Sequence, residues 1–511
     1  MANGYPPLYE VRMTTRALGV VAVAGMLLAS CSGASVSPSS PPTEPSGSRT
    51  PGIPSLGSVP ATPIPSRPNF KPGELVNYTA QTGDTVPALA ARFNTTAPEI
   101  MAANPLIPGD ATTMPPGLPM RIPIYFRSLW GSAYQILPDA AFVNGPEQVG
   151  FNTSAFVATK SGWYGKYRTY AAGRDRTGAE VVDYVATHWS VSPRLLLAIL
   201  EHQAGGLSQT RPPARRYILD FEQPLYAGAT NLNYLQLVWA ANTLNNGYYG
   251  WRSGELTEFY TPDGTIIRPD PWQNAATVAL QYFFSRTQTG EDYEATVGPA
   301  GFIQSYRALF GDPYAAGSVL IPGSLHQPQL SLPYQRKQIW TYTGGPHTGW
   351  GTGAPLAAID FAPPCDGPGC AGLTPETRAA AMADGLVVRS GPDGVVLDLD
   401  HDGDERTGWT LLYLHLAARG RVILGSELKA GDPIGYPSSE GGEATGTHVH
   451  VARKYNGEWI LADGPLAFDL DGWIAHEGDA PYLGTLERNG ITVTACTCSD
   501  LYSAVPAMPL P

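Results

Sequence analysis

The segment GTHVHVA, residues 446–452, constrains the fold of the last third of the chain more than any other feature. The β-branched residues around His448 and His450 favour a strand, and residues i and i+2 of a strand point to the same face. With a rise of about 3.3 Å per residue, the two imidazoles lie roughly 6–7 Å apart. The segment therefore predicts a strand with two imidazoles on one face, close enough to serve one metal site.

Three more residues complete a set suited to zinc: His347 in GGPHTGWG, Asp360 in PLAAIDFAPP and His415 in LLYLHLAARG. Two histidines and one aspartate leave the fourth coordination position of zinc to water, as in catalytic rather than structural sites. The whole set predicts a site for one zinc ion of the kind used by mononuclear hydrolases. A structural role is expected for the remaining histidines, which are His188, His202, His326, His401 and His476.

The length and charge of the chain limit its organisation and partners. A chain of 511 residues has room for about three domains of roughly 150 residues. The net charge of −12 argues against a nucleic-acid partner and against electrostatic adhesion to anionic membranes. Beyond the N-terminal region, no run of 18 or more apolar residues predicts a membrane-spanning helix.

The N-terminal residues 1–31 have the layout of a secretory signal. Arg12 and Arg16 precede the apolar run ALGVVAVAGMLLAS, and Met13 is a candidate for the true initiator. The ending Leu28-Ala29-Ser30-Cys31 resembles a bacterial lipobox. That resemblance implies lipidation of Cys31, export, and attachment to the outer face of the cytoplasmic membrane. A plain signal peptide cleaved nearby is the alternative.

Residues 32–72 are rich in Pro, Ser, Thr and Gly and predict an extended, disordered linker behind the anchor. Four cysteines remain once Cys31 is set aside, and an even number in an exported protein predicts disulfides. The spacing leaves all three pairings open among Cys365, Cys370, Cys496 and Cys498.

Residues 73–126 are interpreted as a small domain with the order strand, GD turn, helix, second helix ending at Asn104, and the strand MRIPI. This unit resembles a LysM domain. The resemblance implies a βααβ fold that binds N-acetylglucosamine of peptidoglycan or chitin along the loops between strands and helices. Gly83, Asp84 and Thr85 are then the candidate glycan-binding residues, and a purely structural module is the alternative.

Residues 127–325 are predicted to be mainly helical, with helices in GAEVVDYVATHWSV, SPRLLLAILEHQAGG, NLNYLQLVWAANTLNNGYYGWR and PWQNAATVALQYFFSR. Ser192 and Pro193 form a helix start. The segment RLLLAILEHQAGG is similar to the helix that carries the catalytic glutamate of lysozyme-like lytic transglycosylases. Gln203 stands at that place and is no general acid, and Glu201 lies about 200° around the helix. We expect an inactive lysozyme-like domain, with an active glycosidase or an unrelated helical scaffold as alternatives.

Residues 326–485 alternate short strands with Gly/Asp/Pro turns and predict an antiparallel all-β domain, followed by a tail, residues 486–511. Over residues 335–470 the sequence resembles the lysostaphin-like zinc endopeptidases of bacterial cell walls, in the motifs YLHL, GDPIG and TGTHVH. Most members place a histidine four residues before the aspartate, where this chain has Leu356. The spacing of thirteen residues between His347 and Asp360 fits the β-lytic branch, which has a longer insertion.

This resemblance assigns His347, Asp360 and His450 as zinc ligands. His415 and His448 would then orient the zinc-bound water, accept its proton and stabilise the oxyanion. Because the chain has no HEXXH motif, a histidine must serve as the base.

A second cluster, Asp398, Asp400, Asp402, Gly403 and Asp404, follows the register of a calcium loop. Its twelfth position is Trp409 rather than Glu, and an Asp/Gly cluster between two strands is typical of a hairpin turn. Calcium is therefore the less favoured interpretation.

Together these features predict an envelope-anchored zinc endopeptidase that hydrolyses peptide bonds of peptidoglycan and contacts both its glycan strand and its stem peptide. The alternatives are a non-catalytic wall-binding activator of another hydrolase, a glycosidase acting through the middle domain, and a secreted protease with other protein substrates. The oligomeric state is left open.

Overall fold

The computed structural model describes residues 69–223, 228–364, 377–497 and 501–507. The predicted signal peptide with Cys31, most of the predicted linker, and Cys365, Cys370 and Cys498 lie outside this part of the chain. The chain divides into Met1–Val59 and Pro60–Pro511, and all described residues belong to the second unit. Among them, no helix is long and apolar enough to cross a membrane.

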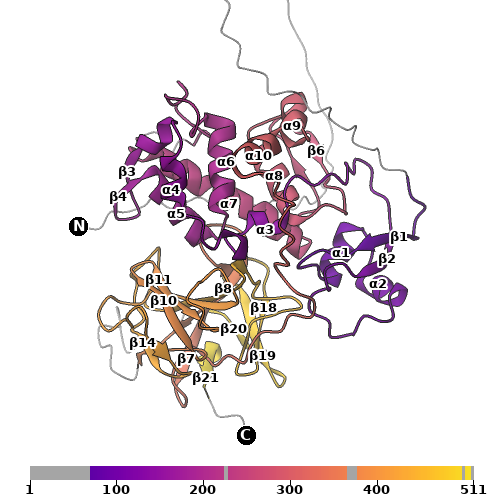
Figure 1. Cartoon of the computed structure of the whole chain (residues 1–511). Coiled ribbons are helices and arrows are strands. Elements are labelled where there is room, and N and C mark those ends of the chain that lie inside the picture. The colour runs from indigo at the N-terminus through magenta and orange to yellow at the C-terminus, as the bar shows by residue number, and fades with distance from the viewer. Residues whose placement is uncertain (1–68, 224–227, 365–376, 498–500, 508–511) are drawn as a thin grey trace, which may run out of the picture. The chain divides into compact units, whose positions relative to one another are not determined.

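The first described domain has the predicted order strand, helix, helix, strand (Figure 1). Strands β1 (Glu74–Thr79) and β2 (Pro119–Ile124) pair antiparallel, with helices α1 (Val86–Arg92) and α2 (Ala97–Ala103) between them. Hydroxyl oxygens cap both helices, since Thr85 accepts from the Ala88 amide and Thr96 forms a capping box with Glu99. The buried core includes Phe93.

The middle region is mainly helical, as predicted. Its helices are α3 (Asp139–Phe142), α4 (Thr153–Ala158), α5 (Gly178–Trp189), α6 (Pro193–Ala204), α7 (Leu232–Ser253), α8 (Ala275–Phe284), α9 (Gly290–Val297) and α10 (Phe302–Phe310). Two short hairpins, β3 (Arg168–Ala171) with β4 (Arg174–Thr177) and β5 (Phe259–Tyr260) with β6 (Ile266–Ile267), accompany them. Ser192 caps α6 with Pro193 in the first turn, and Gly205 ends it in the left-handed region at φ +55°.

The last region is built on an antiparallel sheet of nine strands. Eight of them follow the order β13 (Glu427–Leu428), β10 (Gly385–Gly391), β11 (Gly394–Asp398), β12 (Trp409–Leu414), β15 (Val449–Tyr455), β8 (Leu356–Ala362), β7 (Ile339–Thr348) and β21 (Ala504–Pro506), and β16 (Glu458–Trp459) pairs with β15. A second sheet contains β17 (Asp469–Leu470), β18 (Trp473–Glu477), β19 (Gly484–Arg488) and β20 (Ile491–Thr494), and β9 (Ala379–Ala380) pairs with β14 (Pro433–Gly435).

Residues 486–497 and 501–507 of the predicted tail take part in this fold. The end of β19 and the whole of β20 belong to the second sheet, and β21 pairs with β7 at the edge of the main sheet. Val505 is fully buried. Short strands far from their partners in sequence give weak local patterns, which is why the sequence analysis assigned no strands to these residues. Cys496, just after β20, is disulfide-bonded.

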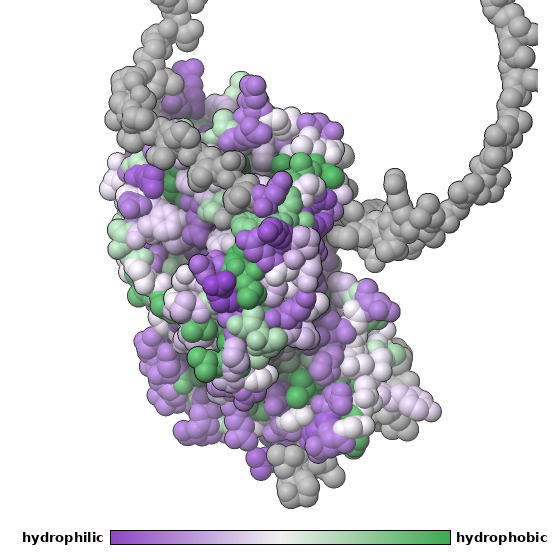
Figure 2. Space-filling model, turned by 90° about the vertical axis from the view of Figure 1, so that its right-hand side faces the viewer, coloured by the Kyte–Doolittle hydropathy of each residue, from purple (hydrophilic) through white to green (hydrophobic). Residues whose placement is uncertain are grey.

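The main sheet is buried on both faces. In β12, Leu411 and Tyr413 join the core shared with the second sheet, whereas Leu412 and Leu414 join the core of the helical region. This explains the near-continuous apolar runs of the central strands, where one solvent-exposed face would give alternation. Apolar residues on the face drawn in Figure 2 occur in small groups among hydrophilic ones.

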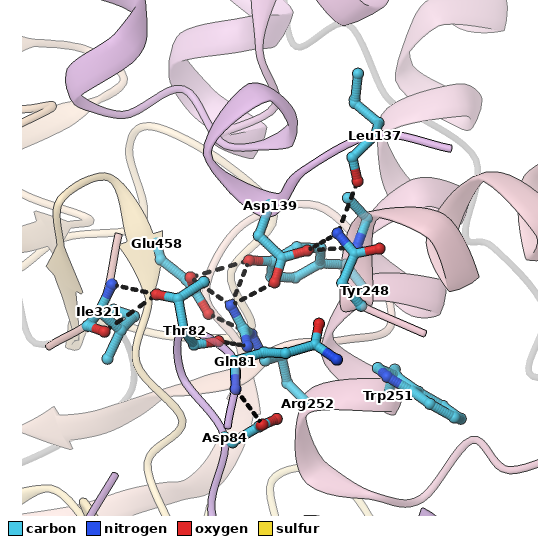
Figure 3. Close-up of polar contacts among 12 residues, drawn as sticks. Gln81, Thr82, Asp84, Leu137, Asp139, Tyr248, Trp251, Arg252, Ile321 and Glu458 are labelled. Carbon is cyan, nitrogen blue, oxygen red and sulfur yellow. Dashed lines mark hydrogen bonds and ion pairs between the residues drawn. The ribbon is translucent and has the colours of Figure 1, made fainter. Parts of the chain in front are cut away.

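A buried arginine links all three regions (Figure 3). The Arg252 guanidinium, on α7, donates to both carboxylate oxygens of Glu458, at 2.9 and 3.3 Å, and to the Tyr248 hydroxyl at 2.9 Å. It forms an ion pair with Asp139 at 3.1 Å and donates to the backbone carbonyl of Thr82. We call Arg252, Glu458, Asp139, Tyr248 and Thr82 the arginine hub.

Candidate metal centre

Three neighbouring strands bring the predicted ligands together. His450 on β15 lies directly opposite Asp360 on β8, and His347 on β7 pairs with Ala358. The register of β7 shifts on both sides of Gly344, which faces Asp360. A Cβ atom on Gly344 would lie 2.5 Å from Asp360 Oδ2, so this glycine gives the carboxylate its room.

The three donor atoms have the spacing of a tetrahedral face. His347 Nε2 lies 2.9 Å from His450 Nδ1, and each nitrogen lies 3.3 Å from Asp360 Oδ1. Ligands at about 2.0–2.1 Å from zinc are separated by roughly 3.3 Å along a tetrahedral edge. The donor set therefore fits zinc in both chemistry and size.

Backbone carbonyls select which ring nitrogen is left for a metal. His347 Nδ1 lies 2.8 Å from the Gly345 carbonyl, and His450 Nε2 lies 3.3 Å from the Gly349 carbonyl. A ring N–H that donates to a carbonyl leaves the opposite nitrogen unprotonated and aimed at the site. Asp360 Oδ1 is buried and makes no hydrogen bond within the described ranges, as expected of a ligand oxygen.

His415 and His448 lie beside this cluster with their rings 4.4 Å apart. His448 Nε2 is 3.8 Å from Asp360 Oδ2, and the His415 ring is 6.1 Å from that of His450. The Nδ1 atoms contact the carbonyls of Glu440 (3.0 Å) and Gly446 (2.9 Å), so both Nε2 atoms are left for chemistry. The structure thus brings together all five residues of the predicted set.

Charge and burial set the protonation states of these groups. Burial alone raises the pKa of Asp360, but His347 and His450 outweigh it and hold that pKa well below its usual range. Burial alone lowers the pKa of His347, but Asp360 outweighs it and raises that pKa. Burial together with His448 and His450 lowers the pKa of His415 to about 4, so His415 is neutral at neutral pH.

The insertion between His347 and Asp360 is held by the helical region. The Asn242 side chain of α7 accepts from the Thr352 amide at 2.9 Å, and that of Asn246 accepts from the Ala354 amide at 2.7 Å. His450 and Asp360 point to the same sheet face as Leu412, the face packed against that region, since strand residues two apart share a face.

The sequence interpretation missed Tyr482, between β18 and β19. Its ring stacks on His347 with centroids 4.1 Å apart, and its backbone bonds to Gly345 and Pro346 fix that position. The side chain is half-exposed, and burial raises the pKa of its hydroxyl. In the sequence, the only signal for Tyr482 is an aromatic residue within the turn segment GDAPYLG. The contact joins two sheets, so no local pattern predicts it.

Of the other candidate residues, Asp84 and Glu201 have structural hydrogen-bond partners. Asp84 is buried and accepts from the Tyr78 hydroxyl at 2.6 Å and from Arg92 at 2.7 Å. Glu201 accepts from the amides of Leu207 and Ser208, and both polar side-chain atoms of Gln203 are buried without a hydrogen-bond partner in the described part of the chain.

The Asp/Gly cluster forms the predicted hairpin turn between β11 and β12. Carboxylate oxygens of Asp398, Asp400 and Asp402 lie within 4.8 Å of one another, and they accept from amides of the same turn. These hydrogen bonds are the ones an Asx turn makes without an ion.

Comparison with known families locates three domains. The LysM domain model matches residues 78–123, the model of the LasA N-terminal domain matches residues 135–323, and that of peptidase family M23 matches residues 371–461. The chain carries a LysM domain, a LasA N-terminal domain and an M23 peptidase domain. The M23 match contains His415, His448 and His450, whereas His347 and Asp360 precede it. The LysM and lysostaphin-like predictions are confirmed, and the lysozyme-like character of the middle domain stays a prediction.

The chain is also similar to individual proteins. Protease LasA of Pseudomonas aeruginosa strain UCBPP-PA14 is 24% identical over 350 residues, covering 64% of this chain and 75% of the relative. Protease LasA of strain PAO1 is 23% identical over the same shares. Among solved structures, the M23 metalloprotease pseudoalterin from the deep sea is 22% identical, with 33% of this chain and 96% of that one covered and a TM-score of 0.28. The catalytic domain of lysostaphin from Staphylococcus simulans is 23% identical over 24% of this chain and 87% of that one, with a TM-score of 0.18.

Proposed function

We propose that this protein is a zinc-dependent endopeptidase that hydrolyses peptide bonds of bacterial peptidoglycan. The observation that carries the proposal is the buried cluster of His347, Asp360 and His450, whose donor atoms lie 2.9–3.3 Å apart. Its M23 and LysM domains and its likeness to Protease LasA support a metallopeptidase that acts at the cell wall.

One zinc ion held by these three residues would polarise the scissile carbonyl and lower the pKa of a bound water toward about 7. The chain itself supplies the proton acceptor. His415 is neutral at neutral pH, and its Nε2 atom is free of the backbone contact that engages Nδ1, so we assign it as general base. His448, 3.8 Å from the Asp360 carboxylate, is assigned to hold the substrate oxygen.

In this proposal the remaining parts of the chain hold the enzyme at the wall. A lipid on Cys31, a linker over residues 32–72 and the LysM domain would hold the peptidase within reach of peptidoglycan. In this proposal the peptidase domain spans residues 326–507, including the strands of the predicted tail.

Two other functions find less support in the structure. A non-catalytic activator has no need of a complete set of metal ligands and catalytic histidines, and all five residues of that set lie together here. A glycosidase that resembles the lytic transglycosylases needs a free carboxylic acid at the end of α6. The Glu201 carboxylate there accepts from two backbone amides, and Gln203 carries no carboxyl group.

Digestion of purified peptidoglycan tests the proposal. We expect wall turbidity to fall and new amino termini to appear with wild-type protein, and both to be lost with chelator or with His450→Ala. His326→Ala changes an exposed histidine outside the cluster and should retain activity. Lysis that survives both chelation and His450→Ala, or reducing sugar ends without new amino termini, would refute the assignment.

A further inference from the structure

The LysM domain presents two loops at one end. Residues 80–85 follow β1, and residues 104–118 precede β2. The loops are joined by the Met114 amide donating to the Asp84 carbonyl and the Gly117 amide donating to the Ala80 carbonyl, each at 2.8 Å. They therefore form one continuous face that carries hydroxyl and backbone groups able to hydrogen-bond a sugar.

Another segment of the same chain lies across this face. Residues 320–325, which we call the strap, lie between α10 and β7, at the end of the match to the LasA N-terminal domain. The Thr82 hydroxyl accepts from the Ile321 amide at 2.7 Å and donates to the Ile321 carbonyl at 3.1 Å (Figure 3). One residue of the first loop thus satisfies both backbone groups of a strap residue.

The second loop binds the strap through three more contacts of one threonine. The Thr113 carbonyl accepts from the Ser324 amide at 2.8 Å, while its hydroxyl accepts from the Leu325 amide at 3.0 Å and donates to the Pro322 carbonyl at 2.8 Å. The neighbouring Thr112 hydroxyl donates to the Leu325 carbonyl at 2.5 Å. As a result, Thr112 and Thr113 are only 8% and 5% exposed.

Close packing completes the contact. A Cβ atom on Gly323 would lie 2.5 Å from Pro115 Cα, so the strap backbone lies directly on the second loop. On the other side, a Cβ atom on Gly83 would lie 2.6 Å from Cζ of Arg252, which also donates to the Thr82 carbonyl. The loop face is thus covered by the strap and by the arginine hub.

We propose that the strap occupies the glycan-binding face of the LysM domain, so that wall glycan binds this protein only by displacing residues 320–325. This inference rests on the proposed function for the identity of the ligand. The polar groups that would bind a sugar are already hydrogen-bonded within the chain and lie beneath the strap, so a sugar reaches them only after the strap and the loops separate. Exposed residues flank the strap, including Val319 and His326, whereas Leu320, Ile321 and Leu325 of the strap are buried, so separating the strap from the loops also costs part of that burial.

Gly323→Val tests the inference with soluble chitopentaose, which has the N-acetylglucosamine chemistry and no peptide bond. Gly323 has no positive φ, so valine there acts by crowding Pro115 and should lift the strap. Gly317→Val, in the same connecting segment, meets nothing within 4 Å and is the matched control. We expect Gly323→Val to bind chitopentaose at least tenfold more tightly than wild type in calorimetry, and the control to match wild type.

Hydrogen exchange in the wild-type protein gives an independent reading if the valine variant fails to fold. Saturating chitopentaose should speed the exchange of the Ile321, Ser324 and Leu325 amides, because their acceptors are lost on displacement. Equal affinity in all three proteins, or bound sugar with unchanged exchange at these amides, would overturn the inference and leave glycan binding intact. No binding by any protein, with the strap amides released in Gly323→Val, would overturn the glycan ligand of the proposed function together with the inference.

Discussion

Arg252→Leu is expected to destabilise the protein far more than loss of an ordinary surface ion pair. The Arg252 side chain is 6% exposed, and its guanidinium lies between the buried carboxylates of Glu458 and Asp139. Removing one partner of a buried ion pair leaves a charge without compensation and costs about 3–5 kcal/mol. That is a large part of the roughly 5–15 kcal/mol by which a folded domain is stable.

The sign of the pH dependence follows from the two carboxylates. Burial already raises the pKa of Glu458 and of Asp139, although Arg252 counteracts it. Without the arginine these pKa values rise further, so the carboxylates bind protons in the folded variant as the pH falls. Protonation removes the unpaired charges, and the destabilisation by Arg252→Leu should therefore be largest near pH 7.5 and smaller at pH 5.

Urea unfolding followed by tryptophan fluorescence at both pH values measures the effect. Arg127→Leu is the control, because Arg127 and Glu258 are 28% and 32% exposed and such pairs contribute about 0–1 kcal/mol. Adding Glu458→Leu to Arg252→Leu should restore part of the lost stability, since it removes one unpaired charge. A loss no larger than that of Arg127→Leu, or one that is the same at both pH values, would refute this account of the hub.

Three further predictions concern the metal centre. Because Asp360 raises the pKa of His347, zinc must displace a proton from His347 in mildly acidic solution. The zinc affinity of the protein should therefore fall by up to tenfold per pH unit below that pKa. Calorimetry that shows the same zinc affinity from pH 7.5 to pH 5.5 would contradict this. Gly344→Ala places a Cβ atom 2.5 Å from the Asp360 carboxylate and should weaken zinc binding at least tenfold in a competition titration, whereas Gly317→Ala, which meets nothing within 4 Å, should leave it unchanged. Tyr482→Ala removes the ring stacked on His347 and should lower kcat/KM about two- to tenfold, whereas Tyr482→Phe keeps the ring; equal losses in both would assign the effect to the hydroxyl instead.

The local elements could be predicted wherever a pattern repeats within one segment. The apolar spacing of α5 and α6, with the cap at Ser192, predicted these helices. The His448–His450 pair predicted the strand β15. These patterns do not predict the strand order, because β8 pairs with β15, which lies far along the chain. Tyr482 and β21 were missed for the same reason, since each acts on a segment more than a hundred residues away.

Exposure is the property that a domain resemblance predicts least well. Gly83, Asp84 and Thr85 stand where the LysM resemblance places sugar contacts, and in an isolated domain nothing else would cover that loop. In this chain Gly83 faces Arg252 of α7, and the neighbouring Thr82 binds the strap. These partners lie about 170 and 239 residues further along the sequence, so no local pattern predicts them. A binding face inferred from a module holds for the whole protein only if the rest of the chain leaves that face open.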